Sequence, residues 1–95
     1  MILSLKKNVL ISGGSRGIGA ASAEQFLKSG CNVGMFSRSM SNLNKFKSKL
    51  KKKYPNQKIY IYEYDATKNI NFEEMIFFFK KNFNNKIDIL VNNVG

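Results

Sequence analysis

The sequence predicts an α/β protein built around one doubly wound parallel sheet, in the order β-α-β-α-β-α-β. Two observations lead to this prediction. Short apolar runs alternate along the chain with longer segments whose apolar residues recur at helical spacing. A glycine-rich turn at 12–19 joins the first apolar run to the first helical segment. Because crossovers between parallel strands are right-handed, we expect the strand order 3-2-1-4.

The four expected strands are short and apolar, and they occupy 7–12, 32–37, 58–64 and 87–92. The third is rich in isoleucine and tyrosine, residues that favour strands. The fourth is apolar almost throughout, as in parallel strands that are covered on both faces.

The first helix is expected over 17–29, with Ile18 and Phe26 facing the sheet. Gly30 follows it and is expected to end the helix in the left-handed conformation, which glycine adopts without a steric penalty.

The second helix is expected to begin at a cap supplied by Ser39 or Ser41 and to end before Pro55. Four of its residues form an apolar stripe at helical spacing: Leu43, Phe46, Leu50 and Tyr54. Most of the net charge of +10 comes from lysines on its other faces. This pattern indicates a solvated helix face. Nucleic-acid binding is the alternative, and no nucleic-acid-binding signature accompanies the charge.

The third helix is expected to open at Asn69 or Asn71, with Glu73 and Glu74 in its first turn. Its predicted core-facing stripe consists of Phe72, Met75, Ile76, Phe79 and Phe83. Phe77 and Phe78 fall partly outside this stripe. Extra packing explains them best, and a lipid or subunit contact is the alternative.

The composition narrows the classes of protein. Ninety-five residues suffice for one small domain, and no apolar run approaches the length of a membrane span. The segment before the first strand is too short for a leader peptide, which predicts a cytoplasmic protein. Cys31 is the only cysteine and histidine is absent, so we expect no internal disulfide, no metal site and no histidine-based catalysis.

The glycine turn has the features of a phosphate cradle. Gly13 can adopt the positive φ that turns a strand into a helix, Gly17 lets a diphosphate approach the backbone, and Gly19 lets the helix pack closely on the strand. The helix that follows offers unpaired N–H groups and the positive end of its dipole to an anion.

Three motifs, at the ends of the first, third and fourth expected strands, resemble those of the short-chain dehydrogenase/reductase family. Its Thr-Gly-x-x-x-Gly-x-Gly turn stands here as 12–19, with serine in place of threonine. Its Asp-x-Thr/Ser stands as Asp65-Ala66-Thr67, and its Asn-Asn-Ala-Gly as Asn92-Asn93-Val94-Gly95. The resemblance covers essentially the whole chain and implies the N-terminal half of a Rossmann-type dinucleotide-binding domain.

The resemblance implies that Asp65 contacts the adenine amino group and that the motif at 92–95 lies against the ribose rings of the cofactor. The residues expected to bind cofactor are Gly13, Ser15, Arg16, Gly17, Ile18, Gly19, Ser37, Arg38, Ser39, Asp65, Ala66, Asn92, Asn93, Val94 and Gly95.

The end of the second strand indicates which dinucleotide is bound. A site specific for NAD places a carboxylate there, whereas this chain reads Ser37-Arg38-Ser39. Arg38 can offer a guanidinium to the 2′-phosphate of NADP(H), and Arg16 in the glycine turn can add a second charge. We therefore expect NADP(H) to be preferred over NAD(H).

Catalytic residues are not expected within 1–95. The family's Ser and Tyr-x-x-x-Lys lie well after the asparagine motif. Tyr54 and Lys58 match that spacing, but Pro55 takes Tyr54 out of helical geometry and Lys58 belongs to the next strand. The fourth strand would also be a bare apolar edge. We therefore expect 1–95 to be a partial domain that ends before the catalytic half and binds NADPH weakly or not at all.

The resemblance implies a parent oxidoreductase that reduces a carbonyl by hydride transfer from NADPH, with a 3-oxoacyl or other lipid-type ketone as the expected substrate class. Its expected partners are a small-molecule carbonyl substrate and further copies of itself, with no nucleic acid and no membrane segment in this stretch. The alternative function is a truncated, non-catalytic fragment that binds a nucleotide or a partner.

Overall fold

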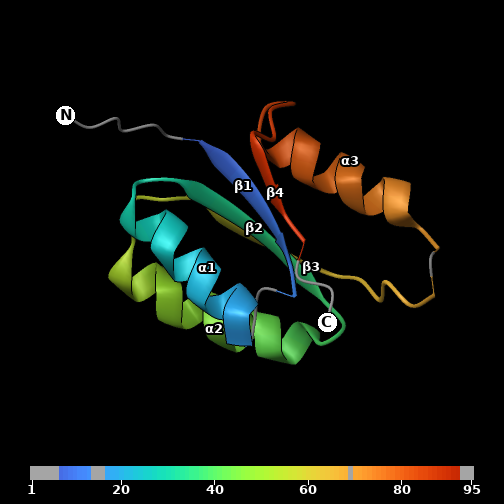
Figure 1. The fold of residues 1–95 in the computed structure, drawn as a ribbon, viewed down its shortest axis with the longest axis horizontal. Helices are drawn as coiled ribbons and strands as arrows, with labels where there is room; N and C mark the ends of the chain where they lie inside the picture. The colour runs from blue at the N-terminus through green and yellow to red at the C-terminus, as the bar shows by residue number, and fades with distance from the viewer. Residues whose placement is uncertain (1–6, 14–16, 69, 93–95) are drawn as a thin grey trace.

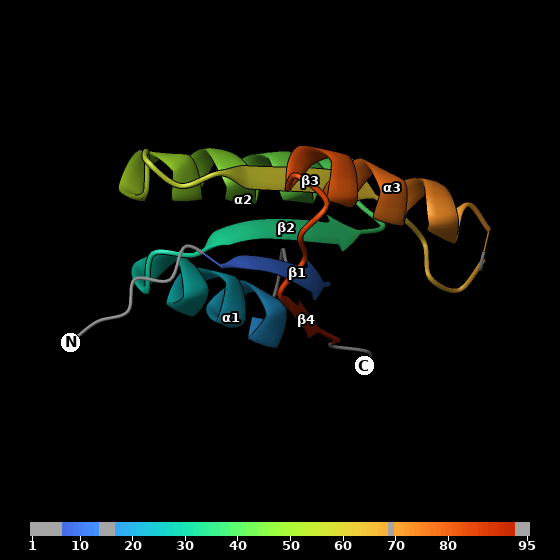
Figure 2. The same cartoon turned by 90° about the horizontal axis from the view of Figure 1, so that it is seen from above.

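The computed structural model describes residues 7–13, 17–68 and 70–92. The elements alternate along the chain as β1 (Asn8–Ser12), α1 (Gly17–Lys28), β2 (Asn32–Ser37), α2 (Met40–Lys53), β3 (Ile59–Glu63), α3 (Phe72–Asn82) and β4 (Ile89–Val91). All strand pairs are parallel and the sheet order is β3-β2-β1-β4, which confirms the predicted fold and strand order (Figures 1 and 2).

Each face of the sheet has its own core. Alternate residues of the strands pack against α1 and α2 on one face, where Leu27 and Leu43 are fully buried. The intervening residues, such as Leu10, pack against α3 on the other face. Figure 1 shows the two helices on one side of the sheet and α3 on the opposite side. None of the helices that the structure describes is long and apolar enough to cross a bilayer.

The first helix follows the prediction at its end and departs from it at its start. Gly30 has a φ of 92°, so it does take the left-handed conformation. Phe26 packs against the core, but the expectation for Ile18 is wrong, because 76% of Ile18 is exposed. Small residues occupy the helix–sheet contact in its place: Gly19 and Ala23 are the buried residues in the first turns of α1.

The second helix is capped by Ser39, whose Oγ accepts a hydrogen bond from the backbone N–H of Asn42 at 3.2 Å. The predicted stripe is confirmed, with two residues fully buried and two partly buried against the same core. At its far end Lys53 Nζ lies 2.7 Å from Glu24 Oε2, and the Tyr54 hydroxyl donates to the same oxygen at 3.1 Å. These contacts tie α2 to α1.

The third helix begins after Asn71, which has a φ of 61° and makes no side-chain capping bond. Its predicted stripe needs one correction. Phe72 is 50% exposed, because it stands at the start of the helix, where its ring meets Tyr64. Phe78 packs against the core, as expected for the residues beside the stripe, with its ring centroid 5.1 Å from that of Tyr62 in β3. The same expectation is wrong for Phe77, which is 68% exposed. The helix therefore lies toward the β3 side of the sheet.

The outer strand β4 is shorter than predicted and pairs only with β1 in the described part of the chain. Before it, Asp88 is held by polar contacts: the N–H of Asn8 donates to Asp88 Oδ2 at 2.8 Å. Leu90 is 64% exposed, although its register partner Leu10 is buried. The sheet face beside α3 is therefore open over β4.

Candidate functional site

The carboxyl ends of the parallel strands meet at one edge of the sheet. Ser12, Ser37 and Glu63 end the first three strands, and Asn92 follows the fourth. The chain leaves β1 toward β2 on one side, while β4 lies on the other side. Ligands of doubly wound sheets bind in the crevice at such a switch point.

The glycine turn starts at Gly13, directly after β1, and residues 14–16 lie outside the described part of the chain. Gly13 has a φ of 64°, and its N–H donates to the carbonyl oxygen of Phe36 at 2.8 Å, which fixes the turn against β2. Gly17 opens α1 with a φ of 57°, and a Cβ placed there would meet no atom within 4 Å from other elements of the described chain. The positive φ is therefore what favours glycine at this position, and the space above it is open to a ligand.

The end of β2 leads directly into the N-terminus of α2. Ser39 is half-buried and its hydroxyl caps this helix, and Ser39 Oγ also lies 3.3 Å from Ser41 Oγ. Arg38 is exposed between the strand and the cap, whereas Ser37 is half-buried at the strand end. A guanidinium beside a capped helix N-terminus makes a positively polarised corner.

Asp65 follows β3 in a tight turn. Its Oδ1 accepts hydrogen bonds from Thr67 Oγ1 at 2.6 Å and from the N–H of Thr67 at 2.9 Å. These two bonds, helped by the positive charge of Arg38, hold the pKa of Asp65 below its usual value. The other carboxylate oxygen takes no hydrogen bond from the described residues. Asp65 therefore presents an ionised, oriented acceptor near Arg38.

A pair of buried aromatic rings fixes the ends of β2 and β3 relative to each other. Phe36 precedes Ser37, Tyr64 precedes Asp65, and their rings meet edge to face with centroids 5.8 Å apart. The N–H of Tyr64 also donates to the carbonyl oxygen of Ser37 at 2.8 Å. Because both rings are buried, the loops that carry Arg38 and Asp65 start from a rigid base.

The ends of β1 and β4 are joined by side chains. Ser12 Oγ donates to Asn92 Oδ1 at 3.2 Å, so the motif that follows β4 is connected to the start of the glycine turn. Ser12, Thr67 and Glu63 were not among the expected site residues. The motifs contain Ser12 and Thr67, whereas Glu63 reaches the site because it pairs in register with Ser37.

The structure brings the described part of the expected site to one edge of the sheet. Ile18 is exposed at the start of α1, Gly19 is buried beneath it, and Ala66 is exposed in the turn after Asp65. The other expected residues lie outside the described part of the chain: Ser15, Arg16, Asn93, Val94 and Gly95.

The described residues can bind an anion and a hydrogen-bond donor a short distance apart, which suits a phosphorylated nucleoside.

Tyr54 and Lys58, the pair that matches the Tyr-x-x-x-Lys spacing, lie at the opposite edge of the sheet, between the end of α2 and the start of β3. No group of three metal-ligating side chains forms within 7–13, 17–68 and 70–92.

Comparisons with known proteins agree with this geometry. A family model described as short chain dehydrogenase matches residues 7–95. Chlorophyll(ide) b reductase NOL of Arabidopsis thaliana is 35% identical over 88 residues, which cover 93% of this chain and 25% of that protein. A 3alpha-hydroxysteroid dehydrogenase of Mediterraneibacter gnavus is 34% identical over 97 residues, covering 100% of this chain and 38% of that protein.

Two solved structures are similar over nearly all of the chain. A short chain oxidoreductase of Pseudomonas aeruginosa PAO1, solved with NADPH and described as having an atypical catalytic center, gives a TM-score of 0.89 at 27% identity, covering 98% of this chain and 35% of that one. L-sorbose reductase of Gluconobacter frateurii, solved with NADPH and L-sorbose, gives 0.85 at 30% identity, with 94% and 33% covered. The chain thus spans about a third of these proteins.

Proposed function

The chain belongs to the short-chain dehydrogenase/reductase family, and from that premise we propose that it is the NADP(H)-binding portion of a carbonyl reductase. The open turn at Gly17, the ionised acceptor at Asp65 and the exposed cation at Arg38 fit the diphosphate, adenine and 2′-phosphate of such a cofactor. When bound, NADPH supplies the hydride that reduces a carbonyl.

The chain's own residues would hold the adenosine half of the cofactor. The free oxygen of Asp65 would accept a hydrogen bond from the adenine amino group, because Thr67 already occupies the other oxygen and fixes the carboxylate. The N-terminus of α1, which is 12 residues long, would face the diphosphate across the open turn at Gly17. Arg38 would pair with the 2′-phosphate beside the N-terminus of α2.

The observation that carries the preference for NADP(H) is Arg38 at the β2 end, close enough to Asp65 to lower the pKa of its carboxyl group. A carboxylate at the β2 end itself would repel a phosphate, and none stands at 36–39. Glu63 brings an acid to the neighbouring strand, where it pairs with Ser37. The two charges oppose each other, so the preference is best tested by removing each of them.

Titration calorimetry with 2′,5′-ADP and 5′-AMP tests this proposal on the adenosine half-site that the described residues form. We expect the chain to bind 2′,5′-ADP more tightly than 5′-AMP. Arg38→Ala should raise the dissociation constant of 2′,5′-ADP about tenfold or more and should change that of 5′-AMP little. Glu63→Gln should strengthen the binding of 2′,5′-ADP. Lys49→Ala is the control, since it removes an exposed charge from α2 away from the site. Equal losses in Arg38→Ala and Lys49→Ala would refute a specific 2′-phosphate site.

The reaction of the whole protein is proposed as reduction of a lipid-type ketone, for example a 3-oxoacyl group. The relatives' names support a carbonyl or alcohol substrate on a larger molecule, since they concern chlorophyll(ide) b and a 3alpha-hydroxysteroid. A cytoplasmic location and a homo-oligomeric state stay predictions, and the Arabidopsis relative is named as chloroplastic. Reading the transcript past the codon for Gly95 tests the enzyme directly, because a downstream serine and Tyr-x-x-x-Lys must follow.

The alternative is a fragment that binds a nucleotide or partner without chemistry, and the open sheet edge at β4 favours it. A transcript that stops after Gly95, together with tight NADPH binding by the 95 residues, would support this alternative. It would also contradict the expectation that the half-site binds NADPH weakly.

A further inference from the structure

The outer face of α2 carries a straight row of lysines. Lys45, Lys49 and Lys52 are exposed and have the spacing i, i+4 and i+7, which places them in one line along the helix. The buried Leu43 and Leu50 lie on the opposite side of the same helix. At about 1.5 Å per residue, the three lysines extend over about 10 Å of the helix axis. These three side chains are called the lysine row below.

No acid of the described chain balances the lysine row. Helix α2 contains six lysines and no aspartate or glutamate. Lys53 pairs with Glu24, and Lys51 donates a hydrogen bond to the carbonyl oxygen of Gln57 at 2.9 Å. In contrast, no ion pair or hydrogen bond joins the lysine row to the residues that the structure describes. The row therefore presents an unneutralised line of positive charges.

The same face is poorly suited to packing against protein. Ser41 and Ser48 lie between the lysines and are exposed and polar. The large apolar residues Leu43, Phe46 and Leu50 are turned toward the sheet and pack in its core. Burying ammonium groups without acidic partners is costly, so a further segment of polypeptide is an unfavourable cover for this face. The chemistry of the face instead favours an anionic partner.

We propose that the lysine row binds an anionic membrane surface, with α2 lying flat on the lipid headgroups. A line of flexible point charges is complementary to a planar layer of phosphate groups, because all three side chains can reach it at once. Duplex nucleic acid is bound by elements that enter a groove and by arginine forks, and α2 has no arginine. The charge pattern therefore favours lipid headgroups over nucleic acid.

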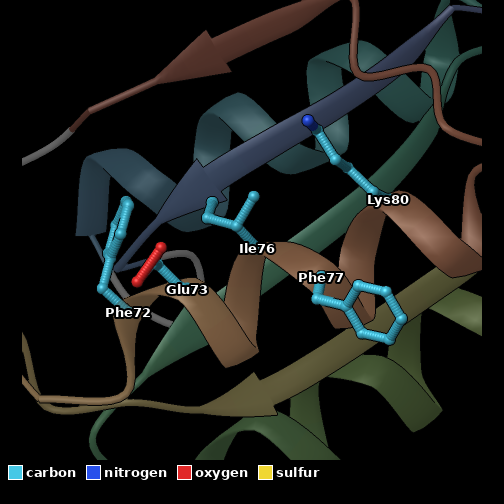
Figure 3. Close-up of a pocket in the computed structure, with 5 residues that line it drawn as sticks. All are labelled: Phe72, Glu73, Ile76, Phe77 and Lys80. Carbon is cyan, nitrogen blue, oxygen red and sulfur yellow. The ribbon is translucent and has the colours of Figure 1, made fainter.

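The opposite side of the molecule lacks this charge pattern. Helix α3 lies on the other face of the sheet (Figure 1) and carries two acids in its first turn and two lysines in its last. A hollow of about 280 Å³ on this helix is lined by Phe72, Glu73, Ile76, Phe77 and Lys80 (Figure 3). Its two charges have opposite signs and cancel. The unbalanced positive charge is therefore on the α2 side, and it would orient the protein on an anionic surface.

Co-sedimentation with sucrose-loaded vesicles tests the proposal. Each lysine near an anionic surface multiplies the partition constant about fivefold, so the lysines of α2 together predict a molar constant on the order of 10⁴ M⁻¹ on phosphatidylcholine–phosphatidylglycerol vesicles of about 7:3 composition. Binding should fall steeply between about 50 and 500 mM salt, because the charges are exposed. No binding, or equal binding to pure phosphatidylcholine vesicles, would overturn the proposal.

Replacing the whole lysine row gives the sharper test. The triple variant Lys45→Gln, Lys49→Gln and Lys52→Gln should lower the partition constant about a hundredfold. Arginine at the same three positions should retain binding, which a merely structural role of lysine does not predict. Circular dichroism should show an unchanged fold, because the side chains are exposed and glutamine has nearly the helix propensity of lysine.

A matched control removes the same charge from another place. The triple variant Lys80→Gln, Lys81→Gln and Lys86→Gln alters exposed lysines in and just after α3, and its partition constant should fall about threefold at most. Equal losses in the two triple variants would overturn the proposal, because net charge alone would then explain the binding.

Two further measurements separate the lysine row from other sites. Fluorescence anisotropy with a DNA duplex at the same salt concentration reports on nucleic acid. Duplex binding that depends on the lysine row, without vesicle binding, would overturn the proposal in favour of nucleic acid. Calorimetry with 2′,5′-ADP should give the same affinity for the lysine-row variant and the wild type. A failed vesicle test would therefore leave the proposed cofactor site standing, and loss of 2′,5′-ADP binding in this variant would contradict a separate membrane surface.

Discussion

Replacing Gly34 by alanine tests how α3 is seated on the sheet. Gly34 lies in the middle of β2, and a Cβ built on it would lie 2.7 Å from Cδ1 and 2.8 Å from Cε1 of Phe79. Cε2 of Phe83 would be 3.1 Å away. Ordinary carbon–carbon contacts lie at about 3.5–4.0 Å, so the added methyl group requires Phe79 to move by most of an ångström.

The surroundings oppose that movement. Phe79 is fully buried, and the rings of Phe36, Tyr62, Phe78 and Phe83 have centroids within 6.4 Å of its own. Overpacking of this kind costs about 1–3 kcal/mol. Alanine returns about 0.4–1 kcal/mol by restricting the unfolded chain. The net loss should be about 1–2 kcal/mol, which lowers the melting temperature by about 5–15 °C in a domain of this size.

Urea unfolding followed by far-ultraviolet circular dichroism measures the loss, and a double-mutant cycle identifies its cause. Phe79→Leu removes the part of the ring that the new methyl group meets, so Gly34→Ala should cost less in that background than in the wild type. Gly30→Ala is the control: its cost arises from a φ of 92°, with no atom within 4 Å, and Phe79→Leu should not relieve it. Additive losses for Gly34→Ala and Phe79→Leu would refute the contact.

Three further predictions concern side chains with defined partners. Thr67→Val should raise the pKa of Asp65 toward its usual value, and an unchanged carboxyl shift in an NMR titration would contradict the turn geometry. Because folding lowers this pKa, the stability that Asp65 contributes is present above its unfolded pKa and is lost as the pH falls through the folded value. The bond from Lys53 likewise lowers the pKa of Glu24, so Glu24→Gln should flatten the acid limb of the stability curve, and an identical limb would count against that contact. Cys31 is 6% exposed and should react with Ellman's reagent only as the chain opens, whereas immediate labelling would mean that the α1–sheet core is loose.

Much of the fold could be predicted because its signals are local. The alternation of apolar strands and amphipathic helices fixes the parallel order, and the lysines of α2 leave one stripe, with Leu43 and Leu50, for the core. Glycines with positive φ stand where the turns need them, at Gly13 and Gly30. Each of these features depends on the type and spacing of neighbouring residues, which the sequence contains in full.

The errors arose where a helix's position on the sheet decides burial. Phe72 was assigned to the core-facing stripe, but it stands at the start of α3, where it is 50% exposed and its ring meets Tyr64. Phe77 was expected to add packing, but it is 68% exposed. Ile18 was assigned to the sheet from its apolar character alone. Periodicity gives the direction of a side chain around its own helix, and it does not give the height or offset of that helix above the strands.

The sequence by itself determined the family and the strand order, because motif spacing and periodicity are properties of the chain. Tertiary structure alone decided that Ser12 bonds to Asn92, that Glu63 stands beside Ser37, and that Arg38 acts on the carboxyl group of Asp65. These partners are 80, 26 and 27 residues apart along the chain. Only the folding of parallel strands into register brings such distant residues together, and no local pattern specifies that proximity.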